Sequence, residues 1–203
     1  MGGSQLLRTV AVEHRAVECR RPFEAVKQAL EALVPALRPD VQSMLVGADT
    51  EKIAIARRDG PKLWLFLARD HGALTAADGL HRKAIQYEIG NPLTAERMTR
   101  HILTASLYAP LRVILVENEE GLARFEYDLP SSLFGQFGDD RVTAVGQELD
   151  GELEAVLEQA GRAPEHGVAP VGGRQSLRTT RRPHIARRAE QPSSDHSDAR
   201  RWA

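Results

Sequence analysis

The sequence contains little cysteine and no long apolar run, and these absences exclude several classes of protein. Cys19 is the single cysteine among 203 residues, so an internal disulfide framework is excluded and a reducing compartment is indicated. No apolar stretch approaches the ~18 residues that a membrane-spanning helix needs. The first residues lack the basic and apolar regions of a secretory signal peptide. We therefore expect a cytoplasmic protein with no membrane among its partners.

The patterns typical of catalytic and metal centres are also missing. His71, His81 and His101 do not show the spacing of a metal motif, and a single cysteine cannot form a CxxC pair. Ser131-Ser132 is not surrounded by the glycines of a nucleophile elbow. We expect Cys19 to be a half-exposed thiol at the start of a helix-entry loop and not a catalytic nucleophile, because no obvious activating base lies near it in sequence. No metal and no cofactor are expected, and the sequence leaves open whether the protein is an enzyme.

Charge is distributed unevenly along the chain. Residues 1–160 carry 18 Lys and Arg against 24 Asp and Glu, a net charge of −6, whereas residues 161–203 carry 9 Arg against 4 acidic residues, a net charge of +5. The second segment is dominated by Pro, Gly, Ser, Arg and His without apolar periodicity, so burial cannot offset the entropy of ordering it. We expect one domain over residues 1–160 and a disordered Arg-rich tail over residues 161–203. Nucleic acid is expected to bind weakly through this tail or not at all.

Hydrophobic periodicity predicts strands and helices throughout residues 1–160. Apolar residues recur at three- and four-residue steps in the helical segments and at every second position in several strands. Residues 52–57 also alternate like a strand, but a short helix capped by Asp49 is favoured. The expected strands are 6–14, 63–67, 83–89, 111–117 and 122–128, and the expected helices are 22–34, a short one after Asp49, 92–108 and 140–160, with a loop over 129–138.

This order of elements predicts an α+β fold. We expect a two-layer sandwich in which a mostly antiparallel sheet carries the helices on one face, in the order β-α-β-β-α-β-β-α. Residues 118–121 are predicted to form a tight hairpin connection in which Gly121 supplies a positive φ. The strand over residues 122–128 alternates cleanly, so one of its faces should be buried and the other solvated or salt-bridged.

The start of the helix after residue 90 is the best candidate for a ligand site. Asn91 precedes Pro92, and its side-chain oxygen can cap a free N–H group of the first helical turn. The free N–H groups and the helix dipole also favour an anion at this position. We therefore predict a small anionic ligand there, while the alternative is that Asn91 only caps the helix and Gly90 only forms the turn.

Further donors would complete this site if they converge on it. Arg112 follows on a neighbouring strand, although it could instead pair with Glu126 or Asp128 across the sheet. Two serines come from the loop over residues 129–138, and one tyrosine lies just before the turn. The candidate ligand-binding residues are Tyr87, Gly90, Asn91, Arg112, Ser131 and Ser132.

Several motifs resemble a known family. The segments YEIGNPLTAERM, LYAPLRVILVE and FEYDLPSSLFGQFGD, followed by Glu148-Leu149-Asp150, are similar to the prokaryotic family catalogued as domain of unknown function 302. The resemblance covers roughly residues 8–160. It implies a compact two-layer domain that often pairs as a homodimer, and it brings no established activity, cofactor or catalytic residue.

Two functions from different classes follow from these observations. The first is a non-catalytic, homodimeric binding module for a small anionic ligand or a partner protein. The alternative is an enzyme of unknown reaction with a pocket around the Gly90-Asn91-Pro92 helix start.

Overall fold

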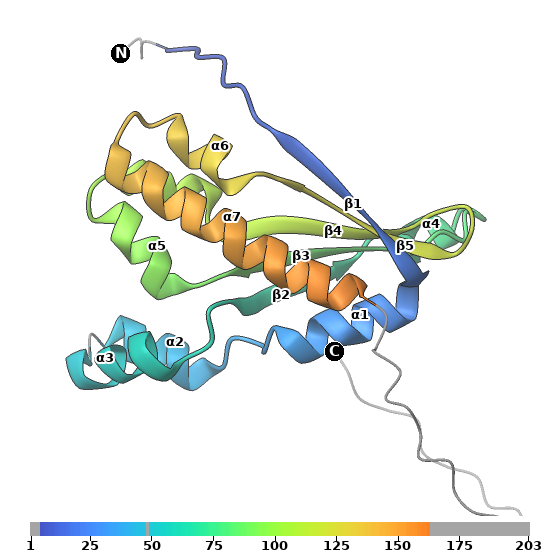
Figure 1. Cartoon of the computed structure of the whole chain (residues 1–203), viewed down its shortest axis with the longest axis horizontal. Helices are drawn as coiled ribbons and strands as arrows, with labels where there is room; N and C mark the ends of the chain where they lie inside the picture. The colour runs from blue at the N-terminus through green and yellow to red at the C-terminus, as the bar shows by residue number, and fades with distance from the viewer. Residues whose placement is uncertain (1–4, 48, 163–203) are drawn as a thin grey trace, which may run out of the picture. The chain divides into compact units, whose positions relative to one another are not determined.

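The computed structural model describes residues 5–47 and 49–162, so the predicted tail lies outside the described residues from residue 163 onward. Strands and helices alternate much as their periodicity predicts (Figure 1). The elements are β1 (His14–Pro22), α1 (Phe23–Leu33), α2 (Pro39–Val46), α3 (Thr50–Asp59), β2 (Trp64–Asp70), α4 (Gly72–Ala76), β3 (Ala84–Gly90), α5 (Pro92–Thr99), the 3-10 helix η1 (Leu103–Tyr108), β4 (Leu111–Glu117), β5 (Leu122–Asp128), α6 (Pro130–Gly135) and α7 (Asp140–Gly161).

The strands form a five-stranded sheet in the order β1-β5-β4-β3-β2, and every neighbouring pair is antiparallel. The register aligns Val17, Phe125, Leu115 and Ile85 in one row across four strands. Helices α1 and α7 pack over the face that this row occupies, and Figure 1 shows α7 crossing the strands. The predicted α+β fold with an antiparallel sheet and helices on one face is therefore confirmed.

The two faces of the sheet differ in the way that strand alternation predicts. Tyr87, Val113 and Phe125 are fully buried against the helices. The opposite face carries charged side chains at the alternate positions of β5, where Arg124 forms an ion pair with Glu126, but in β4 it also carries Ile114 and Val116. Burying apolar side chains on one face supplies the main stabilisation of the two-layer arrangement.

The last helix is the longest and has a strong local start signal. Asp139 caps α7 by accepting hydrogen bonds from the backbone N–H groups of Arg141 at 2.9 Å and Val142 at 3.4 Å. Its apolar stripe, which includes Leu149 and Leu153, is buried as predicted. Within the described residues, no helix has the length and apolar character needed to cross a membrane.

The first strand begins later than its predicted range of residues 6–14. β1 spans His14–Pro22, and its ladder with β5 starts where His14 pairs with Asp128. Cys19 is 3% exposed within this strand, which corrects the expectation of a half-exposed thiol in a loop. Periodicity missed the strand because β1 lies at the sheet edge, where charged residues occupy four of its nine positions and few side chains face the core.

The helix predicted over residues 92–108 is interrupted. α5 ends at Thr99, and Ile102 adopts an extended conformation with φ −131° and ψ 97° before η1 begins. Apolar spacing cannot report this break, because Met98, Ile102 and Ala105 lie at helical spacing whether or not the backbone helix is continuous.

Three short helices were not predicted. The expected loop over residues 129–138 contains α6, residues 39–46 form α2 ahead of the correctly predicted helix after Asp49, and α4 lies between β2 and β3. No side chain of the preceding residue caps α6, so Pro130 at the first helical position is its one local start signal. The acceptor comes instead from Asp150 on α7, at 2.8 Å from the Ser131 nitrogen.

Candidate functional site

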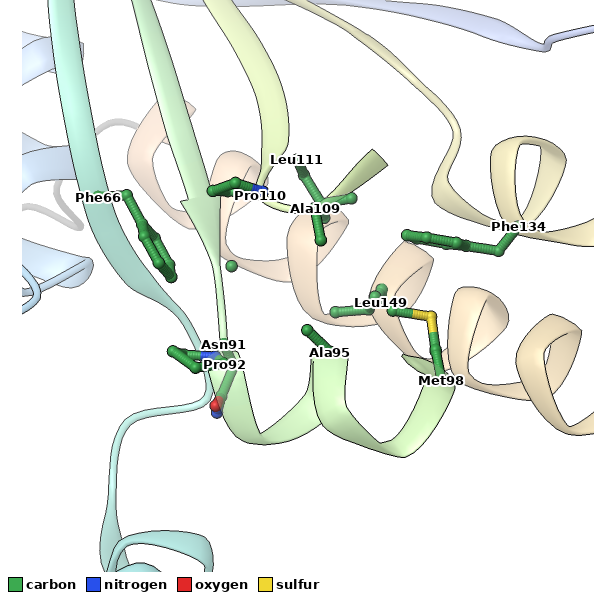
Figure 2. A pocket seen from close by; sticks show the side chains of 11 residues that line it. Phe66, Asn91, Pro92, Ala95, Met98, Ala109, Pro110, Leu111, Phe134 and Leu149 are labelled. Carbon is green, nitrogen blue, oxygen red and sulfur yellow. The ribbon is translucent and has the colours of Figure 1, made fainter. Parts of the chain in front are cut away.

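A cavity of about 110 Å³ lies at the end of the sheet, where β3 runs into α5 and where β4 begins. We call it the end cavity, and Figure 2 shows the side chains that line it. These residues come from β2, the β3–α5 turn, α5, the start of β4, α6 and α7. They are Phe66, Gly90, Asn91, Pro92, Ala95, Met98, Ala109, Pro110, Leu111, Phe134 and Leu149.

The end cavity has a buried floor and a half-buried mouth. Met98, Leu111 and Phe134 form part of the floor and belong to the hydrophobic core. Phe66 and Pro110 stand at the mouth and remain partly exposed. The cavity therefore connects the apolar core to solvent through a rim that is itself mostly apolar.

A β-bulge places Phe66 at this mouth. The register between β2 and β3 shifts between Leu65 and Leu67, so Phe66 is the extra residue in its strand. Bulges redirect a side chain out of the regular alternation and are common beside binding sites. Figure 2 shows the Phe66 ring lying across the opening from Asn91 and Pro92.

Gly90 keeps the end cavity open. A Cβ atom added at Gly90 would lie 3.6 Å from Pro110 Cα and 3.8 Å from Phe66 Cε2, which are ordinary van der Waals distances. A methyl group there would occupy space without a clash. The size of the cavity therefore depends directly on the missing side chain.

Asn91 is the polar side chain among the lining residues, and its groups are engaged in structural contacts. Its Oδ1 accepts a hydrogen bond from the Leu93 backbone N–H at 2.9 Å, which is the predicted cap of α5. Its Nδ2 donates to the carbonyl oxygens of Pro61 at 3.3 Å and Lys62 at 3.1 Å. The amide thus ties the start of α5 to the segment before β2.

Two other predicted site residues lie away from the end cavity. The hydroxyl of Tyr87 donates to Glu31 on α1 at 3.0 Å, and burial together with this carboxylate raises the pKa of the phenol. Arg112 is exposed on the opposite face of the sheet from Leu111 and Val113. Among the described residues Glu126 pairs with Arg124 and Asp128 with His14, so the alternative pairing of Arg112 with these carboxylates is not formed.

The two serines have structural partners instead of facing the end cavity. The Ser131 backbone N–H donates to Asp150 Oδ1, and the Ser132 hydroxyl donates to the Leu129 carbonyl at 2.7 Å. The same hydroxyl accepts a hydrogen bond from the Glu13 N–H at 3.0 Å. Of the predicted site residues, the structure brings Gly90 and Asn91 to the cavity and places the others elsewhere.

Sequence reasoning missed most of the cavity because its residues carry no chemical signature. Met98 and Leu149 lie in helical stripes that periodicity assigns to the core, and Phe66 lies in a strand that is apolar on both faces. Over the part of the chain that the structure describes, no group of three or more His, Cys, Asp or Glu side chains is placed to hold a metal ion.

An antiparallel sheet with helices on one face, and with an apolar cavity at one end, defines a small α+β domain. Residues 61–160 match the family described as Domain of unknown function DUF302. Through this segment, which runs from the turn before β2 almost to the end of α7, the chain belongs to the DUF302 family.

The fold also resembles a solved structure, the crystal structure of the uncharacterized conserved protein DUF302 from Bacillus stearothermophilus. The two chains share 14% sequence identity with a TM-score of 0.53, and the match covers 72% of this chain and 97% of the other. At this identity the likeness shows the fold alone. None of the curated proteins compared with this chain matches it.

Proposed function

We propose that the end cavity binds a small, mainly apolar ligand and that the domain acts as a binding module. The observation that carries this proposal is a cavity already open in the folded chain, with a floor of core side chains and a mouth at the surface. Small-molecule sites are typically concave, mostly apolar and formed before the ligand arrives.

The volume of the end cavity sets the size of the ligand. Its 110 Å³ is comparable with an engineered apolar cavity of about 150 Å³ that stays dry and binds benzene. A single six-membered ring or a short branched chain therefore fits the floor. A larger ligand would have to extend through the mouth past Phe66.

The lining favours binding over chemistry. Catalysis of proton transfer or nucleophilic attack needs a side chain such as His, Asp, Glu, Lys, Tyr, Ser or Cys beside the reacting atom. None of these residue types lines the end cavity. The one polar lining side chain, Asn91, is held by its cap and by two carbonyl oxygens.

A pair of probes tests the proposal and distinguishes an apolar ligand from the small anion predicted at the same helix start. Toluene and benzoate share one ring and differ in the carboxylate. We expect toluene to raise the thermal midpoint of the full chain and to shift the methyl resonance of Met98, which lies in the cavity floor. At ten times its Kd, such a ligand stabilises the fold by about 1.4 kcal/mol.

Two glycine variants provide the control. Gly90→Ala should weaken toluene binding because the new methyl group occupies the cavity. Gly151→Ala lies on α7 with no atom within 4 Å of its added Cβ, so toluene binding should be unchanged. Stabilisation by benzoate but not by toluene would replace the apolar ligand with the anion, and no response to either compound would refute the proposal.

A further inference from the structure

The end cavity opens toward the outer face of the sheet, which we define as the face opposite α1 and α7. In β3, Ile89 is buried on the inner face, so its neighbours Glu88 and Gly90 belong to the outer face. A Cβ atom at Gly90 would lie 3.6 Å from Pro110 Cα and 3.8 Å from Phe66 Cε2, and these two residues stand at the mouth (Figure 2). A ligand that extends out of the mouth therefore emerges onto the outer face beside them.

Arg112 lies just beyond this mouth, although it does not line the cavity. The register pairs Ile89 with Leu111 and Glu88 with Arg112. Leu111 is buried and lines the cavity, whereas Arg112 is exposed on the outer face. Residues two apart in a strand lie on the same face about 7 Å apart, so Arg112 is one such step beyond Pro110. A long arginine side chain can span that distance to the mouth.

The two carboxylates that flank Arg112 on the sheet are engaged by other cations. Glu88, opposite Arg112 on β3, forms an ion pair with Arg69 at 2.6 Å. The continuing register of β4 with β5 sets Asp128 on the other side, where His14 Nδ1 lies 3.0 Å from its carboxylate. In the part of the chain that the structure describes, the Arg112 guanidinium is thus left without a carboxylate partner. A cation in this position is available to an anionic group of a ligand.

We propose that the ligand of the end cavity is an amphiphilic carboxylate, whose ring or short chain fills the cavity while its carboxylate binds Arg112 outside the mouth. This inference rests on the proposed function, because the apolar part must first occupy the cavity. The planar guanidinium offers parallel N–H donors that match the two oxygens of a carboxylate. The apolar side chains of Phe66 and Pro110 lower the local dielectric beside this ion pair, which strengthens it relative to bulk water.

The separation of the cavity from Arg112 requires a linker between the two parts of the ligand. In benzoate the carboxylate is attached directly to the ring, so a ring inside the cavity would hold the charge among the apolar residues of the mouth. Burying a charge there without a partner is costly. A linker of two carbons carries the carboxylate past Phe66 and Pro110 to the outer face, where Arg112 is exposed.

Two further probes test this inference with the full chain. Phenylpropionate and phenylpropanol share a ring and a two-carbon linker, and they end in a carboxylate and a CH₂OH group respectively. Titration calorimetry on the wild-type protein should give a Kd about fivefold lower for the acid than for the alcohol, as a partly shielded ion pair provides. This preference should shrink at high salt, because salt screens the attraction between the two charges.

Two arginine variants locate the carboxylate. Arg112→Gln should abolish the preference for the acid and leave the Kd of the alcohol unchanged, because the cavity lining is intact. Arg20→Gln is the matched control: Arg20 is an exposed residue of β1 toward the other end of the sheet, where Pro22 pairs with Leu122. This variant should keep the preference. The thermal midpoint of each variant without ligand checks its folding.

Toluene, measured on the same proteins, separates the two proposals. Binding of toluene together with equal affinities for the acid and the alcohol would overturn this inference and leave the apolar site standing. Absence of binding by toluene, the acid and the alcohol would remove the proposed function and this inference with it. A preference for the acid that survives in Arg112→Gln, or that disappears in Arg20→Gln, would show that Arg112 does not bind the carboxylate.

Discussion

The carboxylate of Asp150 on α7 accepts a hydrogen bond from the backbone N–H of Ser131 on α6 at 2.8 Å. The residue before α6, Leu129, cannot cap the helix with its apolar side chain, so a neighbouring helix supplies the acceptor for its first turn. Free N–H groups at a helix start need such a partner or water. The formation of α6 therefore depends on its packing against α7.

Replacing Asp150 should destabilise the domain through this contact. We expect Asp150→Ala to lower the free energy of unfolding by about 1–2 kcal/mol, because the Ser131 N–H loses its acceptor. Asp150→Asn keeps an oxygen at the same position and should lose clearly less. Urea titration of the three proteins measures the difference, and equal losses in both variants would show that the hydrogen bond is not the cause.

Two glycines on α7 should respond in opposite directions to alanine. A Cβ at Gly146 would lie 3.0 Å from Ser131 Cα and 3.2 Å from Phe134 Cβ, whereas a Cβ at Gly151 would meet nothing within 4 Å. Gly151→Ala should stabilise the protein by roughly 0.5–1 kcal/mol through helix propensity. Gly146→Ala should cost about 1–3 kcal/mol because α6 must move away. Thermal unfolding compares them, and equal midpoints would contradict the close approach of α6 and α7.

Removing the hydroxyl from each of two buried tyrosines on the sheet should change the free energy of unfolding by different amounts. Tyr87 donates to Glu31 at 3.0 Å, whereas the buried Tyr127 hydroxyl makes no hydrogen bond of normal geometry among the described residues, although the Arg15 guanidinium is its neighbour. We expect Tyr87→Phe to cost about 1 kcal/mol and Tyr127→Phe to be neutral or stabilising, since removing an unpaired buried hydroxyl relieves its desolvation. Chemical denaturation measures both, and a larger loss for Tyr127→Phe would reveal a partner for its hydroxyl.

The ionisation of His14 should depend on the neighbouring strand. Its Nδ1 lies 3.0 Å from Asp128 and its Nε2 lies 3.4 Å from Glu126. Hydrogen bonding to Asp128, with a smaller contribution from Glu126, raises the pKa of His14 above its ordinary value of 6.5. The stabilisation from the protonated ring is thus fully present below pH 6.5 and is lost as the pH rises through the raised pKa.

Proton NMR measures this titration directly. The wild-type His14 resonance should titrate with a pKa above 6.5, and Asp128→Asn should bring the pKa back toward that value. Asp70 provides the control, because its carboxylate caps α4 through the Ala73 N–H. The Asp70→Asn variant should leave the His14 pKa unchanged. A His14 pKa that does not respond to Asp128→Asn would show that the contact is absent in solution.

The sequence by itself determined the features that local chemistry decides. Asn91 before Pro92 and Asp139 before α7 predict helix starts, because their caps bond to N–H groups only a few residues away. The alternation in β5 predicts its buried and charged faces, and Gly121 predicts the hairpin after β4, where its φ is 77°. These elements were sufficient to predict the α+β class.

Only the tertiary structure decided the features that join distant residues. α6 depends on a carboxylate that lies 19 positions away, and no local pattern contains that information. The end cavity arises where a bulge at Phe66, a missing side chain at Gly90 and the floor residue Leu149 meet, although each is ordinary in its own element. The volume left between packed side chains depends on their three-dimensional arrangement, so no periodic pattern in the sequence predicts it.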